Sequence, residues 1–211
     1  MPVTAKICGL STPETLDAAI AGGASHVGFV FFAPSPRNIS IDQAAALAVR
    51  VTGRAKIVGL FVDPEPGLID AVRKLVHLDA IQLHGGEHPA MVGRLQMQHG
   101  IEVWKAIPVR TASDLALSHK YRGQRILFDA KPPADSAVPG GTGLRFDWKL
   151  LEGFRHTSPW ILSGGLDARN VAEAVRITGA TLVDVSSGVE SSPGIKDVDK
   201  IAAFLHAVAR S

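Results

Sequence analysis

Two ionisable side chains stand where an apolar run of this sequence ends and a loop begins. Asp129 closes the run Arg125-Ile-Leu-Phe-Asp129, and Cys8, the only cysteine, follows a shorter run at residues 3–7. A carboxyl and a thiol delivered to the ends of strands are the expected layout of a proton-transfer site in a parallel α/β protein. We therefore predict that Cys8 and Asp129 serve one site.

Each of these side chains has a structural alternative. A free cysteine behaves by default as a small buried hydrophobe, and Asp129 could instead cap a helix or anchor a loop. Lys6 shares a strand face with Cys8 and would favour the thiolate, which is scarce at neutral pH for an ordinary thiol of pKa about 8.5. Arg37, in a loop, suits a substrate carboxylate through its planar guanidinium, although a lone loop arginine is more often solvated. His84 is interpreted as a satisfied histidine without a role.

Three glycine-bearing turns follow the last three predicted strands, namely Gly140-Gly-Thr-Gly143, Ser163-Gly-Gly165 and Ser186-Ser-Gly188. Glycine lets the backbone approach a ligand closely, and backbone N–H groups with a helix N-terminus favour an anion. One such turn says little, because glycine ends many ordinary loops. Together, and in this order along the chain, the three turns predict a small phosphorylated ligand.

The composition argues against several classes of protein. The chain has 211 residues, 46% of them hydrophobic, with a formal net charge of +2 and no basic cluster, so we expect one domain and no nucleic-acid partner. With a single cysteine and eight histidines that show no ligand spacing, we expect no disulfide and no metal site. The absence of a signal-peptide pattern and of an apolar run of about 18 residues predicts a cytoplasmic protein without a membrane segment.

Apolar periodicity predicts strands at residues 3–7, 26–32, 56–62, 80–83, 102–107, 126–128, 160–162 and 182–185, and helices at 14–21, 40–52, 67–76, 89–99, 112–121, 148–154, 168–178 and 198–209. The patterns Ser11-Thr-Pro-Glu14 and Ser40-Ile-Asp-Gln43 predict capping boxes for the first two helices. Strands separated by helices must run parallel. Eight such units predict one α/β domain over residues 1–211, a closed (β/α)8 TIM barrel with parallel strands. The alternative, an open doubly wound sheet, usually has a Gly-rich turn after its first strand, whereas Gly22-Gly23 follows a helix.

Side-chain alternation adds detail to the barrel. Residues two apart in a strand share a face, so Lys6 lies with Cys8, and Asp184 lies with Ser186. Polar residues would be out of place on a face covered by helices, so we place them inside. Because the last strand neighbours the first in a closed barrel, we predict that Lys6 and Asp184 pair there. The alternative role for this pair is only to neutralise two buried charges.

An ordered set of short motifs runs from Lys6 to about Phe204, nearly the whole chain. The motifs are Lys6-Ile-Cys-Gly9, Gly28-Phe-Val-Phe-Phe32 with Ser35-Pro-Arg37, Val58-Gly-Leu-Phe-Val62, Ile81-Gln-Leu-His-Gly85, Phe128-Asp-Ala130, Gly140-Gly-Thr-Gly143 with Phe146-Asp-Trp148, Ser163-Gly-Gly-Leu166, and Val183-Asp-Val-Ser-Ser-Gly-Val-Glu190 with Pro193-Gly-Ile-Lys-Asp197. The set resembles the phosphoribosylanthranilate isomerase family of tryptophan biosynthesis. Because the motifs occur together and in this order, the whole set is far more specific than any single motif.

The resemblance implies a single barrel without cofactor that performs an Amadori rearrangement, converting an aminoaldose into 1-(2-carboxyphenylamino)-1-deoxyribulose 5-phosphate. Carried over by position, it makes Cys8 the general base, Asp129 the general acid and Arg37 a contact for the anthranilate carboxylate. The implied phosphate contacts are Gly141, Thr142, Gly143, Gly164, Gly165, Ser187 and Gly188.

These implied roles fit the chemistry. Opening the furanose ring requires a proton on the ring oxygen, so Asp129 must be protonated when substrate binds, which an apolar site and a nearby phosphate would favour. The resulting iminium acidifies the neighbouring C2' proton. Cys8 removes that proton, giving an enolamine that tautomerises to the ketone.

Three rival interpretations stand beside this one. The sister isomerase of histidine biosynthesis resembles a two-carboxylate enzyme with two similar halves, and this chain shows no half-repeat. A phosphosugar epimerase would need a metal set, and a barrel that only binds a phosphorylated metabolite would not need both Cys8 and Asp129. The sequence leaves open whether the protein is a monomer or a homodimer, whether it also accepts the histidine-pathway aminoaldose, and whether residues 131–139 form a lid.

Overall fold

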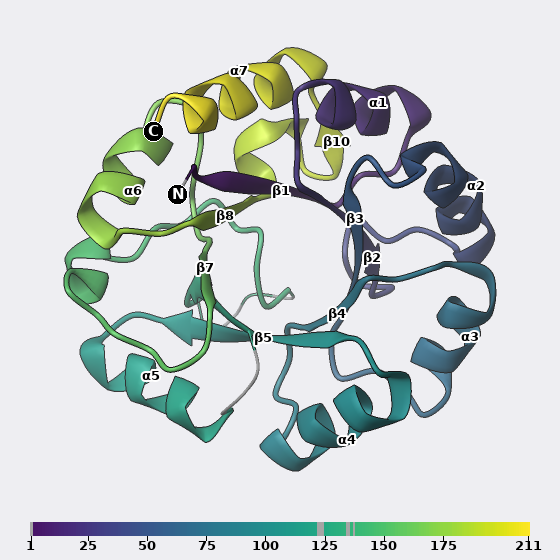
Figure 1. Cartoon of the computed structure of the whole chain (residues 1–211), viewed down its shortest axis with the longest axis horizontal. Helices are drawn as coiled ribbons and strands as arrows, with labels where there is room; N and C mark the ends of the chain where they lie inside the picture. Colours follow the sequence, from purple (N-terminus) through teal and green to yellow (C-terminus); the bar gives the residue numbers. More distant parts are fainter. Residues whose placement is uncertain (1, 122–124, 134–135, 137) are drawn as a thin grey trace.

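In the computed structural model, which describes residues 2–121, 125–133, 136 and 138–211, eight parallel strands close into a barrel (Figure 1). The strands are β1 (Thr4–Cys8), β2 (His26–Phe31), β3 (Lys56–Phe61), β4 (Ala80–Leu83), β5 (Glu102–Val109), β6 (Arg125–Ala130), β7 (Trp160–Leu162) and β8 (Leu182–Val185). They pair in chain order, and β8 returns to β1 with Lys6 opposite Asp184. The predicted closed barrel is confirmed, and the open-sheet alternative is wrong.

Within the described part of the chain, seven α-helices form a ring around the strands (Figure 1). They are α1 (Pro13–Ala21), α2 (Ile41–Val51), α3 (Leu68–Leu75), α4 (Pro89–His99), α5 (Ala112–Ala116), α6 (Val171–Thr178) and α7 (Val198–Ala209). Three 3-10 turns, η1 (Leu117–Lys120), η2 (Trp148–Leu151) and η3 (Ser187–Val189), and an antiparallel pair, β9 (Glu190–Ser192) with β10 (Ile195–Lys196), complete the elements. Among these helices, none has the length and apolar character needed to cross a membrane.

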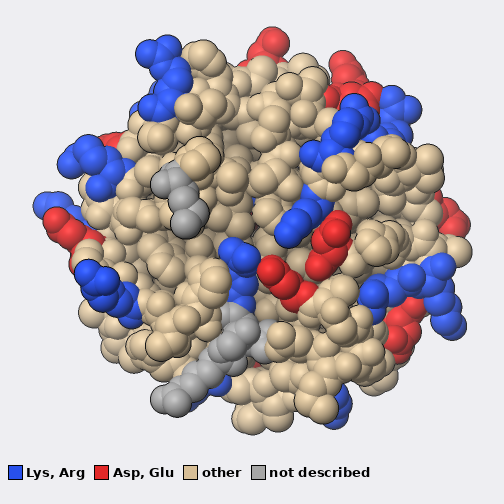
Figure 2. Space-filling view, viewed as in Figure 1, with Lys and Arg blue, Asp and Glu red and all other residues tan. Residues whose placement is uncertain are grey.

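Charged side chains are interspersed over the molecule. Figure 2 shows acidic and basic groups mixed on one face, with no broad area of a single sign among the described residues drawn there. This distribution agrees with the formal net charge of +2.

Two predicted helices differ from the structure because local groups end the α-helical pattern. The helix expected at residues 148–154 is a single 3-10 turn, η2, and Gly153 just beyond it has a φ of +67°, which does not continue a right-handed helix. The helix expected at 112–121 tightens after Ala116 into η1. There the Ser118 hydroxyl donates to the Leu115 carbonyl at 2.6 Å, a bond that competes with the regular ladder. The expectation of eight α-helices is therefore wrong by one.

The predicted N-cap residue is confirmed at one helix and wrong at the other, and the predicted capping box forms at neither of them. Ser40 begins α2, and its hydroxyl accepts from the Gln43 amide at 3.1 Å, although the Gln43 side chain bonds to the Ser11 carbonyl instead of closing a box. The N-cap of α1 is Thr12, not Ser11, because Pro13 occupies the first helical position and the Thr12 hydroxyl reaches the Thr15 amide.

Strand side chains alternate between two apolar cores. One core lies between the strands and the helices. The other fills the barrel and consists of Val58, Ala80, Trp104, Ala106, Leu127, Ile161 and Leu182. These residues share strand faces with Lys6, Gln82 and Asp184, which are also buried. A further apolar cluster of Cys8, Val30 and Leu60 lies on the same faces, so buried polar and apolar side chains share the interior of the barrel.

His26, the first residue of β2, packs the edge of its ring against Trp104, with 5.2 Å between ring centroids. Its Nδ1 lies 2.9 Å from the Ser25 hydroxyl. Burial, aided by the positive charges of Lys6, Lys56 and Arg125, lowers the pKa of His26 to about 4. The fold therefore holds this imidazole neutral at physiological pH.

We expect His26 to make the stability depend on pH. The unfolded chain takes up this proton near pH 6.5, but the folded protein does so only near pH 4. Between these values the unfolded state binds more protons, so stability present above pH 6.5 is lost as the pH falls, by roughly 3 kcal/mol in total. Urea unfolding between pH 7 and 4 measures the free energy of unfolding of the wild type and of His26→Gln. The difference between the two proteins should shrink as the pH falls.

The matched control is His206→Gln, which removes a histidine from an exposed position of α7. Equal slopes for the wild type and His26→Gln would contradict the assignment.

Candidate active site

A pocket opens at the carboxyl ends of the strands and encloses about 700 Å³, its open mouth included. Most of the residues predicted for the site line it: Cys8, Arg37, Asp129, Gly141, Thr142, Gly143, Gly164, Gly165 and Ser187. Gly188 is not among the lining residues, because its backbone packs so tightly against the carbonyl of Leu166 that any side chain would collide there.

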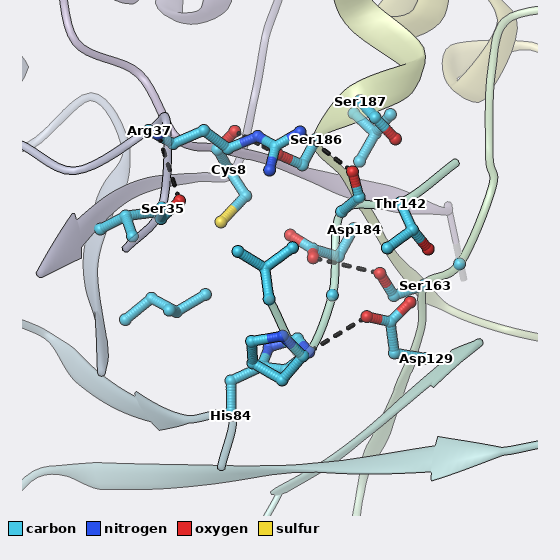
Figure 3. A pocket seen from close by; sticks show the side chains of 18 of the residues that line it. Cys8, Ser35, Arg37, His84, Asp129, Thr142, Ser163, Asp184, Ser186 and Ser187 are labelled. Carbon is cyan, nitrogen blue, oxygen red and sulfur yellow. Dashed lines mark hydrogen bonds and ion pairs between the residues drawn. The ribbon is translucent and has the colours of Figure 1, made fainter. Parts of the chain in front are cut away.

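Cys8 and Asp129 reach the pocket from different parts of the barrel. Figure 3 shows the sulfur of Cys8 and the carboxylate of Asp129 directed into the same space from opposite sides. Cys8 ends β1 and Asp129 is the penultimate residue of β6, and both are almost fully buried. The parallel strands bring the two groups together as the sequence predicted.

A buried ion pair lies beneath Cys8. The ammonium of Lys6 is 2.7 Å from the Asp184 carboxylate, whose other oxygen accepts from the Ser163 hydroxyl at 3.3 Å. This confirms the predicted pairing of Lys6 with Asp184. Burial alone would lower the pKa of Lys6, but the negative charge of Asp184, with a smaller effect from Cys8, raises it above its ordinary value. The Lys6 ammonium, paired with the Asp184 carboxylate, therefore lies two residues before Cys8 on the same strand face.

Asp129 is held by two neighbours. Its Oδ1 accepts from the Ala130 amide at 2.9 Å, and its Oδ2 lies 3.1 Å from His84 Nε2. The other ring nitrogen of His84 is 3.1 Å from the side-chain amide of Gln82. When that amide donates to Nδ1, a neutral His84 carries its proton on Nε2 and donates it to Asp129. The interpretation of His84 as a histidine without a role did not anticipate this contact.

Two glycines bring backbone directly against Asp129. A Cβ on Gly140 would lie 2.6 Å from His84 Nε2 and 2.7 Å from Asp129 Oδ2. On another side, Gly164 has a φ of +89°, and a Cβ there would lie 2.6 Å from the Ala130 amide nitrogen. Only glycine allows this close approach. The loops after β6 and β7 thus cover the carboxylate with main chain.

The three predicted phosphate turns converge in the structure. Gly141 and Gly143 have φ values of +70° and +75°, so this loop follows a left-handed path that exposes its backbone. A Cβ on Gly143 would lie 3.9 Å from the Ser187 hydroxyl, which places the loop after β6 next to the turn after β8. The turn after β8 includes the 3-10 turn η3, which begins at Ser187.

Arg37 is buried and already engaged. Its Nε donates to Glu190 Oε1 at 2.7 Å, and its Nη2 donates to Glu190 Oε2 at 2.9 Å and to the Gly141 carbonyl at 3.0 Å. Nη1 has no hydrogen-bond partner among the described residues and lies over Gly141, where a Cβ would be 2.5 Å away. A ligand carboxylate can therefore meet Nη1 but not the whole guanidinium, which narrows the use we predicted for this side chain.

Glu190 and Lys196 are functional-site residues that the sequence analysis missed. Glu190 opens β9, and its Oε1 also accepts from the Lys196 ammonium at 2.6 Å. Burial opposes ionisation of Glu190, but its bonds to Arg37 and Lys196 outweigh this and lower its pKa below the ordinary value. Both residues stand within the motifs noted above. Arg37, the partner of Glu190, lies 153 positions away from it in the chain, so no local spacing could have revealed the contact.

Comparison with known proteins links this geometry to a family. The family model described as N-(5'phosphoribosyl)anthranilate (PRA) isomerase matches residues 5–207. An N-(5'-phosphoribosyl)anthranilate isomerase from Rhodospirillum centenum is 53% identical over 212 residues, which cover 99% of each chain. A solved structure of monomers of the dimeric enzyme from Thermotoga maritima superimposes with a TM-score of 0.84, at 37% identity over 99% of this chain and 100% of the other. A second solved structure superimposes with a TM-score of 0.85, at 35% identity and with the same coverage. It is a phosphoribosyl anthranilate isomerase in complex with reduced 1-(o-carboxyphenylamino)-1-deoxyribulose 5-phosphate.

The ion pair beneath Cys8 should contribute strongly to stability. Lys6→Met leaves the Asp184 carboxylate buried without its cation, so we expect the free energy of unfolding to fall by about 3–5 kcal/mol. The control is Arg50→Met, which removes one partner of the exposed Arg50–Asp17 pair and should have a far smaller effect. Guanidinium unfolding at pH 7 compares the three proteins, and equal losses in the two variants would contradict the expectation.

Proposed function

This chain belongs to the N-(5'-phosphoribosyl)anthranilate isomerase family, and we propose that it performs the isomerisation with Cys8 as general base and Asp129 as general acid. The family activity is an Amadori rearrangement in tryptophan biosynthesis, and this chain is an enzyme of that kind. The observation that best supports the two assignments is the convergence of one thiol and one carboxyl on the same pocket (Figure 3).

The first step is opening of the ribose ring. Asp129 gives a proton to the furanose oxygen as its bond to C1' breaks, and the lone pair of the anthranilate nitrogen forms an iminium. The carboxyl must therefore be protonated when substrate arrives. The Ala130 amide and His84 Nε2, each within 3.1 Å of this carboxyl, hold it in place for the transfer.

The second step is proton loss from C2'. The iminium draws electrons from the neighbouring C–H bond, so the Cys8 thiolate can take that proton and leave an enolamine. Ketone formation then adds a proton at C1' and removes one from the 2'-oxygen, so the rearrangement is neutral overall. The strand that ends at Cys8 is held below the sulfur by the buried ion pair of Lys6 with Asp184.

Two anionic groups of the substrate orient it between these residues. We assign the phosphate to the turns after the last three strands, with contacts from Gly141, Thr142, Gly143, Gly164, Gly165 and Ser187, while Gly188 shapes its turn from behind. We assign the anthranilate carboxylate to Nη1 of Arg37. A solved relative bound to a reduced carboxyphenylamino-deoxyribulose phosphate carries the same two anionic groups in its ligand.

The proposal extends to the organisation of the protein. Residues 1–211 form one catalytic domain, which the pairing of β1 with β8 supports because it joins both ends of the described chain. The dimeric enzyme of Thermotoga maritima makes a homodimer one possible state, beside the monomer. A cytoplasmic location follows from the substrate, whose phosphate and carboxylate charges do not enter a membrane interior readily.

Removal of either proposed proton-transfer group should abolish most turnover. We expect Asp129→Asn and Cys8→Ser each to lower kcat by about 10²–10⁴-fold, since one positioned acid or base contributes about that factor. The loss of phosphoribosylanthranilate fluorescence, with the substrate generated in situ, measures turnover.

The matched control is Asp199→Asn, an exposed position on α7, which should leave turnover unchanged. A folded wild-type protein without turnover would refute the family activity, whereas full turnover by either site variant would refute the role of that residue.

The close backbone approach at Gly140 gives a steric test. In Gly140→Ala the new methyl group would push between His84 and Asp129, so we expect kcat/KM to fall by roughly 10²-fold, the usual effect of a displacement near 1 Å. Gly93→Ala is the control, because nothing lies within 4 Å of a Cβ there and the helix should gain stability. Normal kinetics in Gly140→Ala would contradict the proposed place of Asp129 in the reaction.

A further inference from the structure

A buried group of three charges lies behind the pocket. Glu190 stands between Arg37 and Lys196, bonded to the guanidinium through both carboxylate oxygens and to the ammonium through Oε1. Relative exposure of the three residues is between 6% and 8%. Two cations share one anion, so the group retains an excess positive charge beside a pocket that takes an anionic ligand.

Glu190 determines the direction of the Arg37 guanidinium. A guanidinium is planar, so a carboxylate that binds Nε and Nη2 together fixes the plane and, with it, the direction of Nη1. The Gly141 carbonyl accepts from Nη2 in the same plane at 3.0 Å. Arg37 and Gly141 both line the pocket, and Nη1 is the nitrogen that lies against Gly141. Without Glu190, this long side chain would have several orientations available.

We propose that Glu190 is a positioning residue that presents Nη1 of Arg37 to the substrate carboxylate. The inference rests on the proposed function, in which Arg37 receives that carboxylate. Glu190 does not itself touch the substrate. It acts by removing the rotational freedom of Arg37 before binding, so that less entropy is lost when the complex forms.

Lys196 keeps Glu190 in place and connects it to the turn after β8. The ammonium donates to Glu190 at 2.6 Å, to the Ser186 carbonyl at 3.0 Å and to the Ser186 hydroxyl at 3.1 Å. That hydroxyl in turn donates to the carbonyl of Cys8 at 3.2 Å. Burial lowers the pKa of Lys196, while Glu190 opposes the shift. The network therefore joins the loop with Arg37, the turn after β8 and the end of β1.

Substrates with and without the carboxylate separate positioning from a merely structural role. The two substrates are the condensation products of ribose 5-phosphate with anthranilate and with aniline. For Glu190→Gln we expect KM of the anthranilate compound to rise by about 10–100-fold, the effect of losing a charge-assisted hydrogen bond. The amide would also turn a donor toward Arg37 or Lys196. We expect kcat, and KM of the aniline compound, to stay within about threefold of the wild type.

Further variants make the test complete. Arg37→Lys should raise KM of the anthranilate compound, and the double variant Arg37→Lys/Glu190→Gln should be no worse than Arg37→Lys alone, because Glu190 acts only through Arg37. Glu190→Asp keeps the charge but is one methylene shorter, so its carboxylate reaches Arg37 less well and should give an intermediate KM even if the glutamine variant fails to fold. Glu173→Gln, at an exposed position of α6, is the control for loss of a glutamate.

Two outcomes would overturn the inference. Equal losses on both substrates in Glu190→Gln, or a normal KM in Glu190→Asp, would reduce Glu190 to a structural anchor. If Arg37→Lys leaves KM of the anthranilate compound unchanged, the proposed carboxylate site itself fails, and the inference fails with it. Turnover by the wild type is measured in the same assay, so failure of the isomerase activity is recognised separately.

Discussion

The pairing of β8 with β1 is the contact on which the site depends, because it joins the two ends of the barrel around a common interior. Its register sets Lys6 opposite Asp184, and their charged groups meet at 2.7 Å, with the Lys6 side chain fully buried and that of Asp184 only 5% exposed. Either charge alone would carry a desolvation cost of several kcal/mol, so the two stabilise this arrangement only as a pair. The pair therefore holds together the two strands whose ends carry Cys8 and Ser186.

Buried ion pairs also hold the loops above the barrel. Glu190 holds Arg37 and Lys196, and on another side Lys105 lies 3.0 Å from Glu87. Both oxygens of Glu87 accept from the amide of Gly85, so this pair fixes the turn that follows His84. Paired charges thus shape the loops, and glycines let those loops come close to the reacting groups. The result is a rigid pocket whose positive groups suit a ligand with two anionic ends.

Local sequence patterns predicted the elements well and their ends less well. Period-two and period-3.6 apolar spacing located all eight barrel strands, because burial on a sheet or helix face imposes that spacing directly. The predicted element ends are wrong where a side chain competes with the regular backbone hydrogen bonds. Asn170 accepts from the Asp167 amide and donates to the Gly165 carbonyl, so α6 begins at Val171 and not at residue 168. Such bonds depend on the path of the preceding loop.

The sequence by itself determined the barrel, the convergence of Cys8 with Asp129 and the family, since strand parity, strand order and an ordered set of motifs are all present in the linear chain. Tertiary structure alone decided which side chains hold the reacting groups. His84 meets Asp129 across 45 positions, and Arg37 meets Glu190 across 153. The physical reason is that a hydrogen bond needs an approach near 3 Å. Barrel closure and the paths of the loops set that distance, and no local spacing of residues encodes either of them.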